Sequence, residues 1–525
     1  MELEKLEKAL QEKNVEVEVP ESDLAYLRKP GPYVCVANTA LSDVDDMVLM
    51  YLFERAGVEG RILSRKQKAP EDFHQHYLPV KYNLLQGDQY VNEVFKVLRK
   101  CREQGMNTAL SLNFSDTRMD ALLRQRLFKR LMKALLKLKV PIIPVRIQAP
   151  FPGFVQPGLG ARLVQRKREE PYRIDVRIGA PIGVEEQALF AKPARFRRYL
   201  QSRIYCLGTR LELRKVFFNP LSSGEGQTAP LAEPIPAEVI SSEIEKLHFG
   251  NLIASQGDFD IYVATAAEIP ESLKEIGRLR ELTFRAVGEG TGKARDLDEF
   301  DVYYRQLILW NRKDKRIAGG YRMGLGDEIF ARYGPDGFYV SSLFKVKPCF
   351  HPVMQKAVEL GRSYVVPDYQ RQRLPLFLLW KGILHFLLQN PHYRYLYGPV
   401  SISKYYSNIS RSLIVAFIEK HYFNHELAAC LKPRKPFRFK PDKVDVDLLT
   451  EGLSDNIQSL DNLIETIEPE HIRLPVLVRQ YLKLNARFIS FNVDPNFSDV
   501  LDGFIILDLQ DVPVEMIEAL KREGQ

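Results

Sequence analysis

Residues 359–370 read ELGRSYVVPDYQ, followed by RQR at 371–373 and by an apolar segment that ends at Gln389. The residues from Ala357 to Val366 predict a strand, and the apolar segment that begins near Leu376 predicts a helix. A strand, a short basic loop and a helix in this order form the repeating unit of an α/β fold. The fold class expected for the chain is therefore α/β.

Two other stretches precede this unit. Residues 279–292 read LRELTFRAVGEGTG, which predicts a helix that runs into a glycine-rich loop, and the acidic stretch DEFD follows at 298–301. Residues 317–323 read IAGGYRM, a predicted strand after a basic turn. The other elements expected in this region are strands at 260–265 and 306–310 and a helix at 273–284.

A linker separates this region from an earlier one. Residues 219–237 contain four prolines and the run SSGEGQ, a composition typical of a linker. Because the chain has 525 residues, several times the usual domain size, we predict one domain at 1–218, a linker at 219–240 and a second domain at 241–525. The first domain is also expected to be α/β, with strands near 33–37, 140–145 and 172–179, the last half-exposed, and helices near 46–55, 121–138 and 193–212.

The composition is that of an ordinary globular protein, with 45% hydrophobic and 27% charged residues. No apolar run reaches the roughly 18–20 residues that span a bilayer, and the start, MELEK, lacks the apolar core of a signal peptide. These features predict a cytoplasmic protein. The five cysteines are far apart and form no CxxC pair, so they imply neither a disulfide framework nor a zinc site, and no metal is expected.

The net charge is +8, and basic residues cluster in RQRLFKR at 124–130 and in RFRR at 195–198. Such clusters suit an anionic partner, which is a lipid surface, an acidic carrier protein or nucleic acid; the alternative is a solvated helix face. The chain contains no recognised nucleic-acid module, and its basic residues are not interleaved with aromatic residues. Nucleic acid is therefore not expected as a partner.

The strand, loop and helix at 357–389 resemble the central unit of the GNAT acyltransferases, although RQRLP at 371–375 replaces the usual glycine-rich loop. In that family the strand offers backbone groups to the pantetheine arm of the acyl donor, and the helix N-terminus receives its phosphate. The resemblance therefore implies that the donor is bound by Ser363, Val365, Val366, Arg371, Arg373 and Leu376.

Together with the stretches at 279–301 and 317–323, this unit resembles the ornithine-lipid N-acyltransferases, which are related to the acyl-homoserine-lactone synthases. The likeness begins near Ile261 and continues to the C-terminus. Further segments that carry it are LWKGI at 379–383, GPVSIS at 398–403, LPVLVRQYLKL at 474–484, NVDP at 492–495 and LDG at 501–503.

The reaction that this resemblance implies is direct transfer of an acyl group to an amine. The amine must be neutral to attack, so a base or a proton relay is needed. Glu359 is the first candidate, as that base or as a clamp on the amino group, and Arg362 is grouped with it as a catalytic residue. The alternative role for Glu359 is an ion pair with Arg362 or Arg322.

Other charged residues are candidates for holding the acceptor. Arg285, Arg322 and Arg362 are suited to a carboxylate, which guanidinium groups bind in a bidentate manner; ordinary surface ion pairing is the alternative. Asp298 and Asp301 are candidates for binding a cationic side chain or for fixing the glycine-rich loop. Some relatives carry a histidine near the position of Gln306, which leaves the proton path open.

In the first domain, residues 36–45 read VANTALSDVD, similar to the first motif of the glycerolipid (lysophospholipid) acyltransferases. In that family a strand ends in Asn-His, and an aspartate five or six residues later orients the histidine, which is the base. Here Asp45 matches the aspartate, but Thr39 stands at the histidine position. A threonine hydroxyl cannot act as a base near neutral pH.

The second motif of that family is also incomplete. Its counterpart here is NFSDTR at 113–118, in which Thr117 and Arg118 are retained. The resemblance implies a domain that has kept the fold, has lost the chemistry and docks the protein to a membrane, carrier or partner.

The order of the two domains resembles the fused bifunctional ornithine-lipid synthases. It implies transfer of a (3-hydroxy)fatty acyl group from acyl-carrier protein, or from CoA, to an amino acid such as ornithine or glycine in bacterial aminolipid synthesis. No permanently bound cofactor is implied; the expected partners are acyl-carrier protein, the amino acid and an anionic membrane surface, to whose inner face the protein is peripheral. The alternatives are an enzyme that acylates both nitrogen and oxygen, and a non-catalytic membrane-peripheral adaptor that binds acyl carriers.

Overall fold

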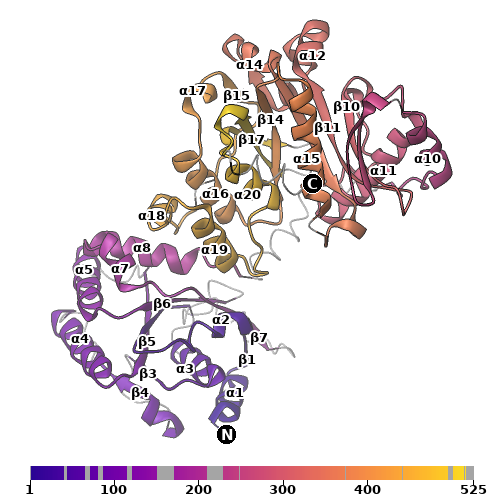
Figure 1. The fold of residues 1–525 in the computed structure, drawn as a ribbon. Helices are drawn as coiled ribbons and strands as arrows, with labels where there is room; N and C mark the ends of the chain where they lie inside the picture. Colours follow the sequence, from indigo (N-terminus) through magenta and orange to yellow (C-terminus); the bar gives the residue numbers. More distant parts are fainter. Residues whose placement is uncertain are drawn as a thin grey trace. The chain divides into compact units, whose positions relative to one another are not determined.

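The chain forms two compact units in the computed structural model (Figure 1). The first unit consists of residues 1–221, 407–413 and 440–473, and the second of 222–406, 414–439 and 474–525. Sequence reasoning assigns all of 241–525 to one domain, whereas residues 440–473 pack with the first unit. The structure describes residues 2–40, 44–64, 71–80, 87–114, 121–149, 171–209, 229–247, 249–372, 374–439, 441–494, 500–513 and 515.

The first unit is built on a seven-stranded sheet in the order β1-β7-β6-β2-β5-β3-β4. The pairs are parallel except β6–β7, which is antiparallel. All five residues of the central strand β2 are buried, as the apolar run VCVAN predicts for a parallel strand covered on both faces. The strands are β1 (Val15–Glu18), β2 (Val34–Asn38), β3 (Gly60–Ser64), β4 (Tyr77–Pro79), β5 (Asn107–Leu112), β6 (Ile142–Gln148) and β7 (Tyr172–Ile178).

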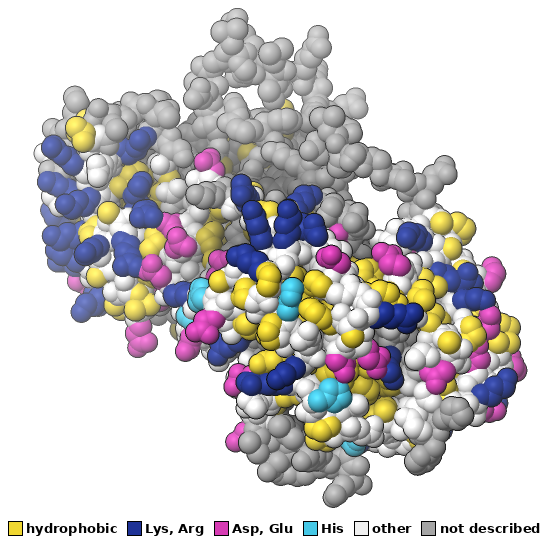
Figure 2. Space-filling view, turned by 90° about the horizontal axis from the view of Figure 1, so that it is seen from above, with side chains coloured by type: hydrophobic (Ala, Val, Ile, Leu, Met, Phe, Trp, Pro, Cys, Tyr) yellow, Lys and Arg dark blue, Asp and Glu magenta, His cyan; other side chains and the backbone are white. Residues whose placement is uncertain are grey.

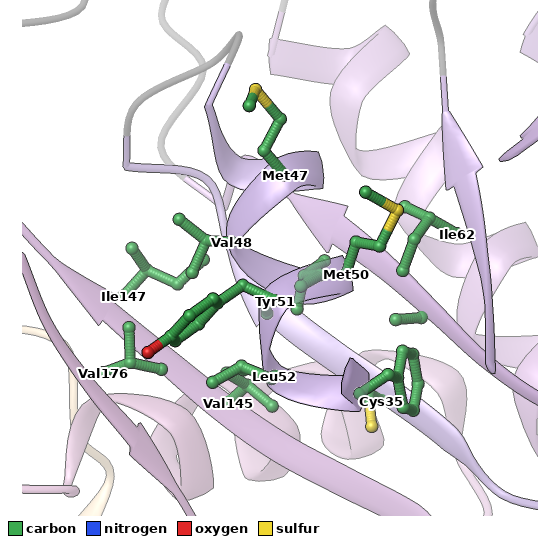
Figure 3. Packing of buried hydrophobic residues seen from close by; sticks show 14 of the residues in the cluster. Cys35, Met47, Val48, Met50, Tyr51, Leu52, Ile62, Val145, Ile147 and Val176 are labelled. Atoms are coloured by element: carbon green, nitrogen blue, oxygen red, sulfur yellow. The ribbon is translucent and has the colours of Figure 1, made fainter. Parts of the chain in front are cut away.

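Helix α3 provides much of the core of this unit. Met47, Val48 and Met50 share one buried cluster with Ile62 of β3 and Ile147 of β6 (Figure 3). The helices of the unit are α1 (Glu2–Glu12), α2 (Glu21–Leu24), α3 (Asp45–Ala56), α4 (Gly87–Glu103), α5 (Ala121–Leu138), α7 (Val184–Leu189), α8 (Pro193–Tyr205), α18 (Val446–Glu451) and α19 (Ile457–Ile467).

Strand β7 differs from its expectation. Its alternating sequence predicts a half-exposed strand, but the last five of its seven residues are buried. Ile174, Val176 and Ile178 join the core cluster on one face, and residues of α2 and α19 cover Arg177 on the other. The polar residue Arg177 is satisfied internally: Nε donates to Asp23 Oδ2 at 2.8 Å, and the two terminal nitrogens donate to the carbonyl oxygens of Gly208 at 2.6 Å and Thr466 at 2.8 Å. The polar position of the alternating sequence is therefore occupied by a buried ion pair and not by a side chain that faces solvent.

The second unit is built on an eight-stranded sheet in the order β16-β17-β14-β13-β11-β10-β9-β8. Its pairs are antiparallel except β13–β14, which run parallel and pair only from Ala357–Glu359 to Tyr395–Tyr397. Beyond Glu359 the two strands separate. The strands are β8 (Leu252–Gln256), β9 (Phe259–Ala264), β10 (Arg305–Asn311), β11 (Arg316–Leu325), β13 (Ala357–Val365), β14 (Tyr395–Ile402), β16 (Arg487–Asp494) and β17 (Val500–Asp508).

Helix α15 packs on β8, β9, β10 and β11, and α11 contacts β13. The helices of this unit are α10 (Ala237–Glu245), α11 (Pro270–Ala286), α12 (Gly326–Tyr333), α13 (Val340–Leu343), α14 (His351–Gln355), α15 (Leu374–Gln389), α17 (His425–Ala428) and α20 (Val476–Lys483). Helix α16 (Asn408–His421) is divided between the two units. The expected α/β class is confirmed, and the strands and helices predicted at 260–389 correspond to β9, α11, β10, β11, β13 and α15.

The cysteines hold one surprise. Cys349 and Cys430, 81 residues apart, form a disulfide next to the small sheet of β12 (Phe344–Val346) and β15 (Leu431–Pro433). Sequence spacing gave no reason to expect it, since the fold alone brings the two residues together. Among the described residues, no helix has both the length and the apolar character required to cross a membrane.

Candidate active site

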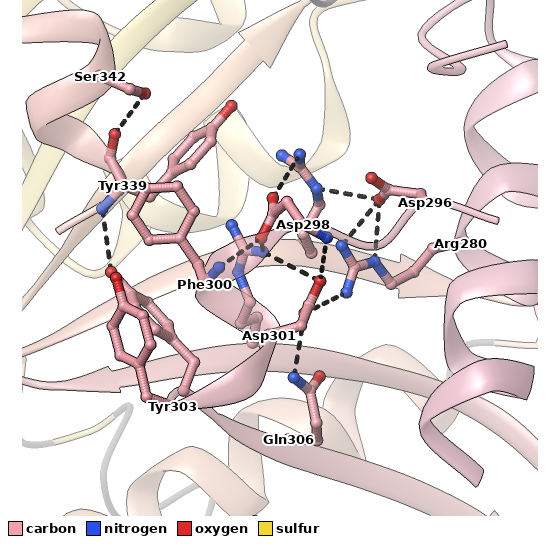
Figure 4. A network of polar contacts seen from close by, with 12 residues as sticks. Arg280, Asp296, Asp298, Phe300, Asp301, Tyr303, Gln306, Tyr339 and Ser342 are labelled. Carbon is pink, nitrogen blue, oxygen red and sulfur yellow. Dashed lines mark hydrogen bonds and ion pairs between the residues drawn. The ribbon is translucent and has the colours of Figure 1, made fainter. Parts of the chain in front are cut away.

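Four of the charged residues singled out in the second unit meet beside β11 and β13 (Figure 4): Arg322, Arg362, Asp298 and Asp301. Arg322 of β11 pairs in register with Gly361 of β13, next to the point where β13 and β14 separate. Three arginines and three aspartates alternate there in one network of ion pairs: Arg280, Arg322, Arg362, Asp296, Asp298 and Asp301. The formal charges of the six side chains therefore cancel.

Arg280 and Asp296 form the buried end of the network, and sequence reasoning did not single them out. Nε of Arg280 donates to Asp296 Oδ2 at 2.9 Å, and one of its terminal nitrogens donates to Asp301 Oδ1 at 2.8 Å. Arg280 lies on α11 and is fully buried. The sequence did contain a signal for this pair, since Arg280 occupies a core position of an amphipathic helix. A charged residue is buried at such a position only when it has a partner of opposite charge.

Asp298 and Asp301 shape the loop that carries them. The Asp298 carboxylate accepts a hydrogen bond from the Phe300 amide at 3.0 Å, and the Asp298 amide donates to Asp301 Oδ2 at 3.0 Å, a reciprocal cap on the turn Glu299–Val302. Burial acts to raise the pKa of Asp301, but Arg280 and Arg322 outweigh it and lower this pKa to about 2. Asp301 is thus an anion at neutral pH and holds the arginines in place.

Arg322 lies in a box of aromatic rings with a side-chain exposure of 1%. Its guanidinium carbon is 5.3 Å from the ring centres of Tyr304 and Tyr339 and 5.5 Å from that of Phe300. One terminal nitrogen donates to Asp298 Oδ1 at 2.5 Å. Nε and the other terminal nitrogen find no hydrogen-bond acceptor among the described residues. Two buried donors therefore remain for a further anionic group.

Glu359 lies within the sheet at 1% exposure and touches a different set of groups. Its carboxyl accepts hydrogen bonds from the amide of Val340 at 2.8 Å, from the amide of Tyr339 at 3.2 Å and from the hydroxyl of Tyr304. Burial raises the pKa of Glu359 to about 7, against the opposing effect of these donors. Glu359 thereby fixes the segment whose Tyr339 ring covers Arg322.

Arg362 adopts a left-handed backbone conformation, with φ of 49°. It lies in a bulge of β13, where the register with β11 shifts between Gly320 and Arg322. The bulge directs its side chain to Asp296, at 3.0 Å from Nε to Oδ2, and to Asp298, at 3.3 Å. The strand is therefore bent at the residue that completes the ion-pair network.

We expect Arg362→Gly to be more stable than Arg362→Ala by roughly 1 kcal/mol, because only alanine keeps the steric cost of the left-handed conformation. Both variants lose the same ion pairs with Asp296 and Asp298, so the difference between their free energies of unfolding reports only the cost of the backbone conformation. Urea unfolding of the full chain measures it. An alanine variant at least as stable as the glycine variant would contradict a strained bulge.

Arg285 lies outside this network and secures the glycine-rich loop. Its Nε donates to Glu281 at 2.7 Å, and a terminal nitrogen donates to the Lys293 carbonyl at 2.6 Å. The buried Glu281 also accepts hydrogen bonds from the amides of Thr291 and Gly292 at 3.0 and 2.9 Å. Gln306, at the position where some relatives carry histidine, donates to Asp301 at 3.2 Å.

The residues expected to bind the acyl donor follow the same strand. Ser363 and Val365 belong to β13, and the amide of Val366 donates to the Ala318 carbonyl at 2.9 Å. Arg371 is exposed, Leu376 lies in the first turn of α15, and Arg373 lies outside the described residues. A small pocket adjoins the separation of β13 and β14, lined by Leu360, Leu396, Tyr397, Gly398, Pro399, Val400, Tyr481, Ile505 and Leu507.

In the first unit, the incomplete acyltransferase motif lies at the end of β2. The amide of Thr39, which follows the strand, donates to the Leu112 carbonyl at 3.0 Å. The fully buried carboxylate of Asp45 accepts from the Ala40 amide at 3.1 Å, so it connects the first turn of α3 to Ala40. Thr117 and Arg118 lie outside the described residues.

Comparisons with known proteins match this part of the chain to acyltransferases. Residues 279–380, which contain all six residues of the ion-pair network and the start of α15, match the acetyltransferase (GNAT) domain. A glycine N(alpha)-acyltransferase of Phocaeicola vulgatus is 31% identical over 312 residues, which cover 55% of this chain and 93% of the relative. Another, of Bacteroides thetaiotaomicron, is 30% identical over 299 residues, which cover 54% and 86%.

Among solved structures, a CoA-dependent acyl-homoserine lactone synthase with SAM and isopentyl-CoA is 18% identical. The match covers 27% of this chain and 66% of that chain, with a TM-score of 0.20.

Proposed function

Because this chain belongs to the family of the glycine N(alpha)-acyltransferases and is an N-acyltransferase with a GNAT domain, we propose that its acceptor is an α-amino acid. The donor is a fatty acyl thioester of acyl-carrier protein, with CoA as the other possible carrier. Glycine is the first acceptor to test, since both relatives are glycine N(alpha)-acyltransferases, and ornithine is the second.

The observation that carries this proposal is the pair of unpartnered nitrogens on Arg322. A guanidinium group binds a carboxylate through two parallel hydrogen bonds, and every α-amino acid presents a carboxylate. Asp298, at 18% side-chain exposure, is the most exposed carboxylate of the network and adjoins Arg322. An acceptor whose carboxylate binds Arg322 presents its ammonium group to Asp298. Arg362, at 12% exposure, also pairs with Asp298, at 3.3 Å.

The reaction follows from that arrangement. The acceptor ammonium loses one proton to solvent, and the lone pair of the resulting amine attacks the thioester carbonyl. As the carbon–sulfur bond breaks, the second proton of the nitrogen passes to the departing sulfur, which gives an amide and a thiol. The donor's pantetheine arm enters where β13 and β14 separate, because unpaired backbone groups at that point are available for hydrogen bonds. The N-terminus of α15 lies beyond β13 and suits the donor's phosphate.

The product of this transfer is an N-acyl amino acid, the lyso form of an aminolipid. The first unit is not required for the chemistry, since Thr39 cannot replace a histidine base. The protein then acts at the inner face of a bacterial membrane, where such a product is inserted.

The test is incubation of the full chain with acyl-carrier-protein thioester, or acyl-CoA, and a panel of glycine, ornithine, lysine and glutamine, with products identified by mass. We expect one N-acyl amino acid to dominate. Thr39→Ala is the matched control and is expected to leave the N-acyl product unchanged. O-acylated product lost in Thr39→Ala would instead assign chemistry to the first unit, and no product with any pair would contradict the proposal.

A further inference from the structure

Lys and Arg side chains gather in groups on the face drawn in Figure 2, with acidic side chains scattered between them. Among the described helices, α5 of the first unit has the most one-sided charge. Its sequence, ALLRQRLFKRLMKALLKL, contains six basic residues and no acidic one. Neither the catalytic network nor the incomplete acyltransferase motif uses this helix.

The exposed cations of α5 lie along one face. Arg126, Lys129, Arg130, Lys133 and Lys137 are all exposed, at spacings of three and four residues that repeat on one side of a helix. The opposite side, with Phe128, Leu131, Met132 and Leu135, is buried. An 18-residue helix is about 27 Å long, so the stripe extends across a large part of the unit.

Exposed apolar side chains lie at the start of the same helix. Leu122 is 65% exposed and Leu123 is 48% exposed. Leu122 lies four residues before Arg126, on the same face as the cations. An isolated exposed leucine needs no explanation, but two consecutive leucines at the end of a cationic stripe form an amphipathic surface of a defined kind.

Nearby cations of α8 strengthen the field at this surface. Burial lowers the pKa of Arg197, and the adjacent guanidinium groups of Arg124 and Arg198 lower it further. Arg198 forms an ion pair with Asp445, which offsets part of its charge. By contrast, four of the exposed cations on α5 form no ion pair with any described residue: Arg126, Lys129, Lys133 and Lys137.

We propose that the outer face of α5, from Leu122 to Lys137, binds the protein to an anionic lipid surface. Each cation within reach of such a surface is attracted to the phosphate headgroups, and the two leucines enter the interface between headgroups and acyl chains. The inference rests on the proposed function only for the role of this membrane binding, which is to deliver the acylated product into the bilayer. An acidic carrier protein matches the charge but gives no role to exposed leucines.

The test measures sedimentation of the full chain with vesicles of phosphatidylcholine, alone or mixed with phosphatidylglycerol. We expect binding to the mixed vesicles only, weakened by salt. The triple variant R126Q/K129Q/K133Q should bind at least about tenfold more weakly, since each cation near the surface contributes. Leu122→Ser with Leu123→Ser should also weaken binding. The matched control is K313Q/K345Q/K432Q, which removes the same charge from exposed positions of the second unit and should bind as the unchanged protein does.

Acyl transfer to a soluble amino acid without vesicles separates this inference from the proposed function. The α5 triple variant is expected to keep that activity while losing vesicle binding. Equal vesicle binding by the α5 variant and the control would overturn the inference and leave the enzyme assignment untouched. If the α5 variant instead loses transfer from acyl-carrier protein without vesicles, the stripe binds the carrier and the lipid assignment is wrong.

Discussion

Replacing Arg322 by methionine is expected to abolish N-acyl transfer and to lower the free energy of unfolding by roughly 3–5 kcal/mol. Methionine fills a similar volume among the rings of Phe300, Tyr304 and Tyr339, so packing is largely kept. The loss comes from Asp298 and Asp301, whose carboxylates are then short of a positive partner in a buried site. Activity is lost because the two nitrogens proposed for the acceptor carboxylate are gone.

Arg316→Met is the matched control. Arg316 begins the same strand, but its side chain is 53% exposed and its ion pair with Asp368 is exposed too. An exposed pair contributes only about 0–1 kcal/mol, so this variant should unfold and react almost as the unchanged protein does. Steady-state transfer at several amino-acid concentrations, with urea unfolding, measures both effects. A folded Arg322→Met enzyme with an unchanged KM for the amino acid would contradict the role given to Arg322.

The second large effect is expected at Glu359, where the variants Glu359→Gln and Glu359→Ala should differ sharply in the rate of acyl transfer. Glutamine retains one oxygen, which can accept from the Val340 amide, and the Tyr339 amide keeps the Tyr304 hydroxyl as an acceptor; alanine leaves the buried Val340 amide without an acceptor. If Glu359 positions the Tyr339 segment, Glu359→Gln keeps transfer within about tenfold. Glu359→Ala then loses at least roughly 100-fold, the scale of a displaced active-site group.

The comparison also distinguishes positioning from proton transfer. A general base contributes roughly 10²–10⁴-fold, and glutamine cannot replace it. If Glu359→Gln folds normally yet loses as much activity as Glu359→Ala, the ionised carboxyl itself takes part in the reaction. Circular dichroism and thermal unfolding of both variants establish that the comparison is between folded proteins.

Stability against pH gives an independent readout at the same residue. The pKa of Glu359 is about 7 in the folded chain and 4.5 for an ordinary glutamate, so folding favours the protonated form. That contribution is complete below pH 4.5 and is lost as the pH rises through 7. Glu359→Gln does not titrate, so its stability relative to the unchanged protein should rise over this interval. A constant difference would contradict the raised pKa.

The fold class and most strands and helices of the second unit could be predicted from the sequence, because their apolar segments are long and regularly patterned. The strand at 357–366 and the helix at 376–389 could be predicted from the alternation of an apolar strand, a basic loop and an apolar helix. The predicted exposure of β7 was wrong, since Arg177 alternates with apolar residues and yet is buried against Asp23. Alternation reports which side chains share a face, not whether that face meets water.

The candidate site was predicted only in part. Arg322, Arg362, Asp298 and Asp301 were expected to bind substrate, and the structure brings them together in one network. Tyr304 and Tyr339 were missed because their roles depend on which residues surround Arg322 in space. Arg285 could not be separated from Arg322 by sequence, since both are arginines in matching stretches; their partners, Glu281 and Asp298, differ only in the folded chain.

Residues 440–473 of the first unit have a consequence for synthesis of the protein. The buried guanidinium of Arg177 needs the carbonyl of Thr466, which the ribosome adds almost 300 residues later. The first unit therefore cannot complete its hydrogen bonds while the second is being made, although N-terminal domains usually fold first. Its final packing waits until Thr466 has been made, and residues 1–221 made as a separate fragment should expose this unfinished surface to chaperones and aggregation.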